Sequence, residues 1–226
     1  YMASLPSRKD RRVISGQHLG HAADLHTRIT ASEVFHHHVE ALAARTGQWL
    51  AMVGVDYGCP PSTVKTELRV DDVNELLIDW WNQGGLVTVC CHAPDPWTPG
   101  ASAWLKDRRT GEERVAHDLR DLITPGNPAN TRWMKDLERW GTALRELRDA
   151  GLVVIWRPFH EMTGDWFWWG HKAYGDDPEP FRELWRHMFT YFTEECELNN
   201  LLWSYTASES TSVPPESCYP GDEFVD

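Results

Sequence analysis

Residues 157–170, with the sequence R-P-F-H-E-M-T-G-D-W-F-W-W-G, combine an arginine and a glutamate with a dense run of aromatic residues. A glycosidic oxygen leaves readily when a carboxylic acid protonates it, and Glu161 could be that acid. A carboxyl group among indole rings loses hydration, which favours its protonated form near neutral pH. Trp rings also stack on the apolar faces of sugar rings. The segment therefore indicates acid catalysis on a carbohydrate.

The same segment also has a purely structural interpretation. Tryptophan is most often a core residue, and an arginine and a glutamate near a strand end often form a structural ion pair. The position of the segment favours chemistry. The apolar run at residues 153–156 is typical of a buried parallel strand, so the polar residues fall at its carboxyl end. In parallel α/β folds, ligands bind at that end.

Short apolar runs predict β-strands, and segments with helical periodicity lie between them. The predicted strands span residues 13–16, 49–55, 86–91, 153–157 and 201–205. Apolar stripes predict helices around residues 35–42, 73–81, 137–147 and 181–192. Thr131 is expected to cap the third of these helices, and Pro180 to lie in the first turn of the fourth.

Alternating strands and helices give either a doubly wound open sheet or a (β/α)8 TIM barrel. No glycine-rich phosphate loop follows a predicted strand, so a nucleotide-binding open sheet is the weaker alternative. We therefore expect an α/β fold of the barrel class, with residues 1–226 in one domain. Because a complete barrel takes about 250 residues, we expect five to six βα units, the sixth strand beginning at residues 224–226.

Composition narrows the possible partners. The 226 residues include 13 Trp and carry a formal net charge of −12, which argues against nucleic acid and anionic membrane surfaces but suits a neutral polysaccharide. No apolar run reaches the roughly 18 residues that a membrane span needs. The spacing of the five cysteines fits neither a zinc site nor a redox motif. Cys90 and Cys91 are expected to be buried, and Cys196 with Cys218 is a possible disulfide.

Two further features have competing interpretations. The histidines at residues 36–38 are adjacent on a predicted helix and cannot converge on one ion, so a solvated cluster is favoured over a metal site. The long segment between His92 and Trp133 is rich in Pro, Gly and charge and contains Trp97 and Trp104. It either lines a groove at the barrel mouth or is a solvated insertion with packed tryptophans. We expect no metal and no cofactor.

The motif at residues 157–170 resembles that of the family 26 glycoside hydrolases, chiefly endo-β-mannanases, with some members acting on mixed-linkage β-glucan or β-1,3-xylan. Residues 77–88, His92 ahead of Asp95-Pro96, and residues 200–203 and 219–226 resemble the same family in the same order. The resemblance thus runs from about residue 15 to residue 226. It implies a (β/α)8 barrel and a retaining hydrolase with an acid/base glutamate after strand four and a nucleophile glutamate after strand seven.

Individual residues take roles from this resemblance. Glu161 matches the acid/base, and three residues match positions around the cleaved sugar: His92, His160 and Trp166. Arg157 would orient the carboxylates, and Trp169 and Trp203 would complete the wall of the substrate site. A secreted, monomeric endo-1,4-β-mannanase is implied.

Two consequences follow for the geometry of this site. Strict alternation places His160 and Glu161 on opposite faces of a strand, so both reach one site only if the chain bends there. The nucleophile is expected outside this sequence. Asp56 and Glu209 would face the barrel mouth and could bind a sugar hydroxyl, but neither matches the nucleophile. A carbohydrate-binding barrel without catalysis is the alternative to an enzyme.

Overall fold

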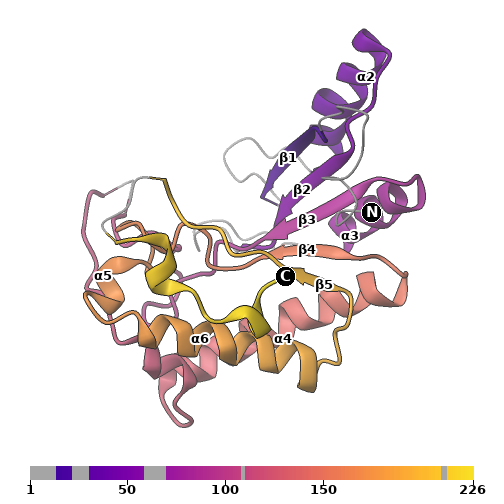
Figure 1. The fold of residues 1–226 in the computed structure, drawn as a ribbon. Coiled ribbons are helices and arrows are strands. Elements are labelled where there is room, and N and C mark those ends of the chain that lie inside the picture. The colour runs from indigo at the N-terminus through magenta and orange to yellow at the C-terminus, as the bar shows by residue number, and fades with distance from the viewer. Residues whose placement is uncertain (1–13, 22–30, 59–69, 108–109, 210–212) are drawn as a thin grey trace.

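The computed structural model describes residues 14–21, 31–58, 70–107, 110–209 and 213–226. Its centre is a parallel sheet with the strand order β1-β2-β3-β4-β5, so each strand lies beside the next one in the sequence (Figure 1). The strands are β1 (Gly16–His21), β2 (Met52–Asp56), β3 (Leu86–Cys90), β4 (Val154–Arg157) and β5 (Leu201–Trp203). Sequential parallel order is the arrangement that repeated βα units produce.

The helices agree with the predicted periodicity. The α-helices are α1 (Ala31–Val34), α2 (Ala41–Thr46), α3 (Val70–Asn82), α4 (Pro128–Asp149), α5 (His171–Tyr174) and α6 (Glu179–Thr190). Two π-helical segments continue α1 and α6, namely η2 (Phe35–Glu40) and η4 (Tyr191–Glu195), and three 3-10 turns are η3 (Leu119–Ile123), η5 (Pro215–Cys218) and η6 (Asp222–Phe224). Figure 1 shows α4 and α6 below the sheet, while the strands end on the side where α5 lies.

Three predictions of element position were wrong. The first strand begins at Gly16 rather than ending there, because pairing with β2 sets its position and not its own apolar residues. Helix α4 is capped by Asn127, whose side chain accepts from the backbone N–H of Ala129, so Thr131 lies inside the helix. No strand forms within residues 213–226, although the backbone N–H of Asp226 donates to the carbonyl of Trp203 at 3.0 Å.

The core is unusually aromatic. Trp133 and Trp140 of α4 are fully buried and pack edge to face with ring centroids 5.7 Å apart. On the sheet side, Trp156 of β4 packs on Phe192 at 5.8 Å. Edge-to-face pairs of this kind add about 0.5–1.5 kcal/mol each to the burial of the rings. The aromatic layer therefore fixes the helices firmly against the strand that precedes the candidate acid.

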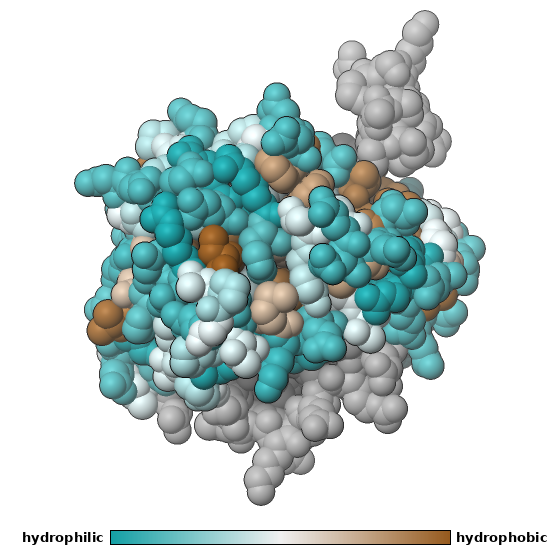
Figure 2. Space-filling model, turned by 90° about the horizontal axis from the view of Figure 1, so that it is seen from below, coloured by the Kyte–Doolittle hydropathy of each residue, from teal (hydrophilic) through white to brown (hydrophobic). Residues whose placement is uncertain are grey.

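The outward face of the helical layer is polar. Figure 2, seen from below relative to Figure 1, shows a largely hydrophilic surface with isolated hydrophobic residues. Among the described helices, none is long and apolar enough to cross a membrane.

Candidate active site

The carboxyl ends of β2, β3 and β4 bring polar residues together at one edge of the sheet. Asp56 is the last residue of β2 and pairs in register with Cys90, which in turn pairs with Arg157, the last residue of β4. His92 follows β3 by two residues. Residues far apart in the sequence therefore meet at the end of the sheet where parallel α/β folds bind ligands.

The chain bends sharply after β4. Phe159 and Glu161 have φ values of 48° and 59°, in the left-handed region that residues other than glycine rarely adopt. The backbone N–H of Glu161 donates to the carbonyl of Thr206 at 2.7 Å, and the indole N–H of Trp169 donates to the carbonyl of His160 at 2.9 Å. The bend that the sequence required is confirmed, and it places His160 inward and Glu161 at the surface of the site.

Glu161 is half-buried and lies beside an indole ring. Its Oε2 accepts a hydrogen bond from Nε1 of Trp166 at 2.8 Å. The ring of Trp166 lies directly over Gly164, where a Cβ atom would overlap it, so glycine is required for this close approach. Within the described part of the chain, Glu161 forms no ion pair.

Hydrogen bonds join three side chains at the strand ends, the last of which belongs to the residue before Glu161. Both oxygens of Asp56 bind His92, Oδ1 through the backbone N–H at 2.9 Å and Oδ2 through Nδ1 of the ring. Nε2 of His92 lies 3.2 Å from Nε2 of His160. Burial, followed by the charge of His92, lowers the pKa of His160 from 6.5 to about 3, so this imidazole is neutral at physiological pH.

The structure corrects the role expected for Asp56. Its side chain is only 2% exposed and both of its oxygens contact neighbouring groups, so a sugar hydroxyl cannot reach it. It supports His92 instead. Glu209, the other carboxylate considered from the sequence, is exposed after β5.

Arg157 is half-buried at the end of β4 and forms no hydrogen bond or ion pair with Glu161. Its positive charge contributes to lowering the pKa of His160. The orienting role expected for Arg157 stays a prediction.

The two remaining tryptophans predicted for the site are buried. Trp169 stacks on Phe167 with ring centroids 4.5 Å apart and also contacts the ring of His160. It therefore forms the wall behind the site. Trp203 packs on Phe189 at 5.0 Å, in the layer between β5 and α6, and the structure does not bring it to Glu161.

The long segment after His92 packs its tryptophans against neighbouring rings. Trp104 forms an isolated antiparallel bridge with Phe167, and the two rings lie 4.8 Å apart. The backbone N–H of Leu105 donates to the carbonyl of Trp166 at 2.7 Å. Farther along, Trp97 stacks on His117 with an interplanar angle of 11°. The contact between Trp104 and Phe167 was not anticipated from the sequence, because Trp104 lies in this distant segment.

The structure also describes the cysteines and the histidine cluster that the sequence singled out. The described cysteines, Cys90, Cys91, Cys196 and Cys218, are buried and form no disulfide, so Cys196 and Cys218 are not joined. Among the described residues, no group of three or more His, Cys, Asp or Glu side chains could hold a metal ion. His36 instead pairs with Glu40 at 2.5 Å.

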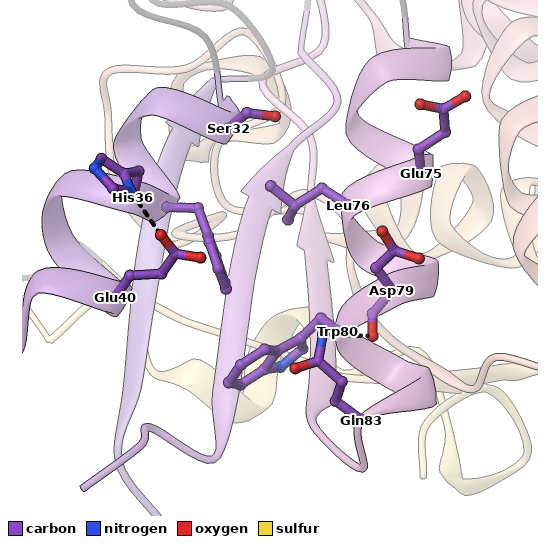
Figure 3. A pocket seen from close by; sticks show the side chains of 9 residues that line it. Ser32, His36, Glu40, Glu75, Leu76, Asp79, Trp80 and Gln83 are labelled. Atoms are coloured by element: carbon purple, nitrogen blue, oxygen red, sulfur yellow. Dashed lines mark hydrogen bonds and ion pairs between the residues drawn. The ribbon is translucent and has the colours of Figure 1, made fainter. Parts of the chain in front are cut away.

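A separate pocket of about 420 Å³ opens between the α1–η2 segment and α3. Figure 3 shows the labelled side chains of both helices around it, with Trp80 at one end. None of the residues that line this pocket belongs to the predicted site; they are Ser32, Phe35, His36, Glu40, Glu75, Leu76, Asp79, Trp80 and Gln83.

Comparison with known proteins places this geometry in context. The sequence profile of glycosyl hydrolase family 26 matches residues 1–226. A mannan endo-1,4-beta-mannosidase (A and B) of Caldalkalibacillus mannanilyticus is 31% identical over 235 residues, which cover 100% of this chain and 42% of that protein. A mannan endo-1,4-beta-mannosidase of Bacillus subtilis is 30% identical over 237 residues, which cover 100% of this chain and 60% of that protein.

Solved structures show the same architecture. A Bacillus subtilis mannanase matches with a TM-score of 0.80 at 25% identity, over 100% of this chain and 65% of its own. A β-mannanase from a symbiotic protist of the termite Reticulitermes speratus, complexed with gluco-manno-oligosaccharide, matches with a TM-score of 0.75 at 29% identity, over 96% of this chain and 63% of its own. The (β/α)8 class is thereby confirmed, with the five parallel strands in the matched part of the barrel. The chain belongs to glycosyl hydrolase family 26.

Proposed function

We propose that this chain carries the acid/base half of a retaining endo-β-1,4-mannanase. One observation supports the proposal most directly: Glu161 lies at the carboxyl end of β4, half-buried, with an indole N–H as its hydrogen-bond partner. The curated relatives described above carry the name mannan endo-1,4-beta-mannosidase. The chain spans 42% and 60% of their lengths, so the activity is proposed for the complete protein.

In this mechanism Glu161 acts twice. As the acid, it protonates the departing glycosidic oxygen while a second carboxylate attacks the anomeric carbon, at a separation of about 5 Å between the two carboxyl groups. As the resulting carboxylate, it then takes a proton from the water that hydrolyses the glycosyl-enzyme. We propose that the second carboxylate is a glutamate outside these 226 residues. Arg157 would then orient that carboxylate from the end of β4.

Substrate contacts are proposed for the residues around Glu161. The exposed part of the Trp166 ring offers an apolar face for a sugar, and His92, with 26% of its side chain exposed, lines the same edge. Trp169 and His160 form the wall behind them. A secreted, monomeric protein fits this proposal, because the polymer is too large to enter a cell.

Product analysis of the full-length protein tests this function. Mannan, mixed-linkage β-glucan and β-1,3-xylan are supplied in parallel, and we expect mannan to be cut internally into short oligosaccharides with the β-anomer formed first. Release of the α-anomer first would refute retention. If mixed-linkage β-glucan or β-1,3-xylan were cleaved in preference to mannan, the proposed substrate would be wrong.

The Glu161→Gln variant tests the role of the acid. Because general acid/base help contributes about 10²- to 10⁴-fold in rate, turnover of mannan is expected to fall by that order while oligosaccharide binding persists. The matched control is Glu75→Gln, which removes the carboxylate of an exposed glutamate on α3. Near-normal hydrolysis by Glu161→Gln would remove this residue from the mechanism.

A further inference from the structure

Asp56, His92 and His160 form a continuous line of hydrogen bonds across the ends of β2, β3 and β4, which we name the strand-end chain. Oδ1 of Asp56 accepts the backbone N–H groups of Gly58 at 2.7 Å and His92 at 2.9 Å, and Oδ2 contacts Nδ1 of His92. The two imidazoles then meet through their Nε2 atoms at 3.2 Å. The strand-end chain ends at His160, the residue that directly precedes Glu161.

The acceptors and donors in this chain fix where the protons lie. Two backbone N–H groups on Oδ1 favour the ionised form of Asp56, and a carboxylate only accepts hydrogen bonds. Nδ1 of His92 therefore carries a proton, and when this ring is neutral its Nε2 is left as an acceptor. Nε2 of His160 must then be the donor between the two rings, with its Nδ1 unprotonated.

The reverse arrangement is disfavoured by burial. If His92 donated from Nε2, the neutral His160 would carry its proton on Nδ1. That atom is buried and has no hydrogen-bond partner among the described residues. A buried N–H group without an acceptor costs about 1–3 kcal/mol. The geometry thus selects one tautomer for each ring.

We propose that Asp56 is a positioning residue, which fixes the tautomers of His92 and His160 and through them holds the bend that carries Glu161. This inference rests on the proposed glycosidase function for its kinetic consequence. A neutral imidazole beside the acid places no positive charge there, whereas an imidazolium would favour the ionised carboxylate. Gly58 is part of the device, because a Cβ atom at this position would lie 2.7 Å from Oδ1 of Asp56 and 2.8 Å from the nitrogen of His92.

Asp56→Asn perturbs this device with almost no change of shape. The asparagine keeps one oxygen, and the two backbone N–H groups on Oδ1 require it at that position. Its NH₂ group then faces Nδ1 of His92, which must become an acceptor. The proton of His92 moves to Nε2, and that of His160 moves to the buried Nδ1. Both tautomers are therefore expected to switch together.

Nitrogen NMR of ¹⁵N-histidine-labelled full-length protein reads these tautomers directly, because protonated and unprotonated ring nitrogens resonate far apart. In the unmodified protein we expect His92 protonated on Nδ1 and His160 on Nε2. The opposite assignment for either ring overturns the proposal, even if Asp56→Asn does not fold. In a folded Asp56→Asn, unchanged tautomers overturn it as well.

Kinetics separate positioning of the acid from a general loss of structure. Asp56→Asn is expected to slow cleavage of mannan by about 10- to 100-fold, the range for residues that support a catalytic group through hydrogen bonds. The second substrate is a dinitrophenyl β-mannoside, whose leaving group departs without protonation. Because acid catalysis, which contributes about 10²-fold or more for poor leaving groups, is not needed here, the rate of dinitrophenol release in the first turnover should change less than about threefold. Equal losses on both substrates would mean that Asp56 supports the fold alone.

Asp95→Asn is the matched control. Asp95 is also buried, and one of its oxygens accepts the backbone N–H groups of Trp97 and Thr98, but its second oxygen faces Arg114 and not an imidazole. The same substitution there should leave the tautomers of both histidines unchanged. If the unmodified protein cleaved none of the β-glycans, the proposed function would fall, whereas the NMR result would still decide the tautomers.

Discussion

Replacing Asp136 with asparagine is expected to stabilise the protein at neutral and alkaline pH. Asp136 lies on α4 with only 20% of its side chain exposed. Burial raises the pKa of its carboxyl from 3.8 to about 6, and Arg139, whose nitrogen lies 3.3 Å from Oδ1, offsets this only in part. The folded protein therefore holds a carboxylate at pH 7 in a place that favours the protonated form.

The size and sign of the effect follow from the two pKa values. A folded-state pKa above the unfolded value contributes stability that is complete below pH 3.8 and is lost as the pH rises through about 6. Roughly two pKa units correspond to about 3 kcal/mol, which partial exposure reduces to about 1–3 kcal/mol. Asparagine cannot ionise, so it avoids this cost. For a domain of this size the melting temperature should rise by about 2–10 °C at pH 8.

Thermal unfolding of the full-length protein at pH 4 and pH 8 measures this directly. The melting temperature of Asp136→Asn should equal that of the unmodified protein at pH 4 and exceed it at pH 8. Glu138→Gln, an exposed residue on the same helix, controls for the loss of one negative charge. If Asp136→Asn gave the same melting difference at both pH values, or melted lower at pH 8, burial would not govern the ionisation of this carboxyl.

Three further predictions concern the site and its surroundings. Trp166→Ala removes the indole N–H that binds Glu161, so binding and turnover of mannan should fall together, and unchanged kinetics would make Trp166 a core residue. Gly141→Ala places a Cβ atom 2.8 Å from Sγ of Cys196, so urea unfolding should show a loss of about 1–3 kcal/mol, and an equal midpoint would contradict this packing. Cys196 and Cys218 are buried thiols that form no disulfide, so an alkylating reagent should modify neither in the folded protein and both in the protein unfolded without reductant. If mass spectrometry found both unmodified in the unfolded protein, they would be joined by a disulfide.

Elements with strong internal signals were predicted well from the sequence. The apolar stripe through Leu184 and Met188 predicted α6, and Pro180 lies in its first turn as expected. The strand β1 was misplaced, because its sequence G-Q-H-L-G-H has little apolar pattern and, within residues 16–20, only Leu19 is buried. Its conformation depends on pairing with β2, which a local pattern cannot reveal.

The candidate site divides in the same way. Glu161, Trp166 and His160 lie in one contiguous motif, in which Trp166 binds Glu161 and His160 contacts Phe167. The role proposed for Asp56 could not be predicted from the sequence, because its partner His92 lies 36 positions away and the two meet only when β2 and β3 pair. Hydrogen bonds between strand ends are consequences of register, and register is set by tertiary packing.

The bend after β4 shows why the site depends on more than the motif itself. Left-handed backbone at a residue other than glycine costs on the order of 1–3 kcal/mol, and both Phe159 and Glu161 adopt it. The contacts that offset this cost come from elsewhere: the carbonyl of Thr206 after β5 and the strand-end chain from β2 and β3. The motif therefore supplies the proposed acid, while residues that follow the neighbouring strands hold its backbone in this bend.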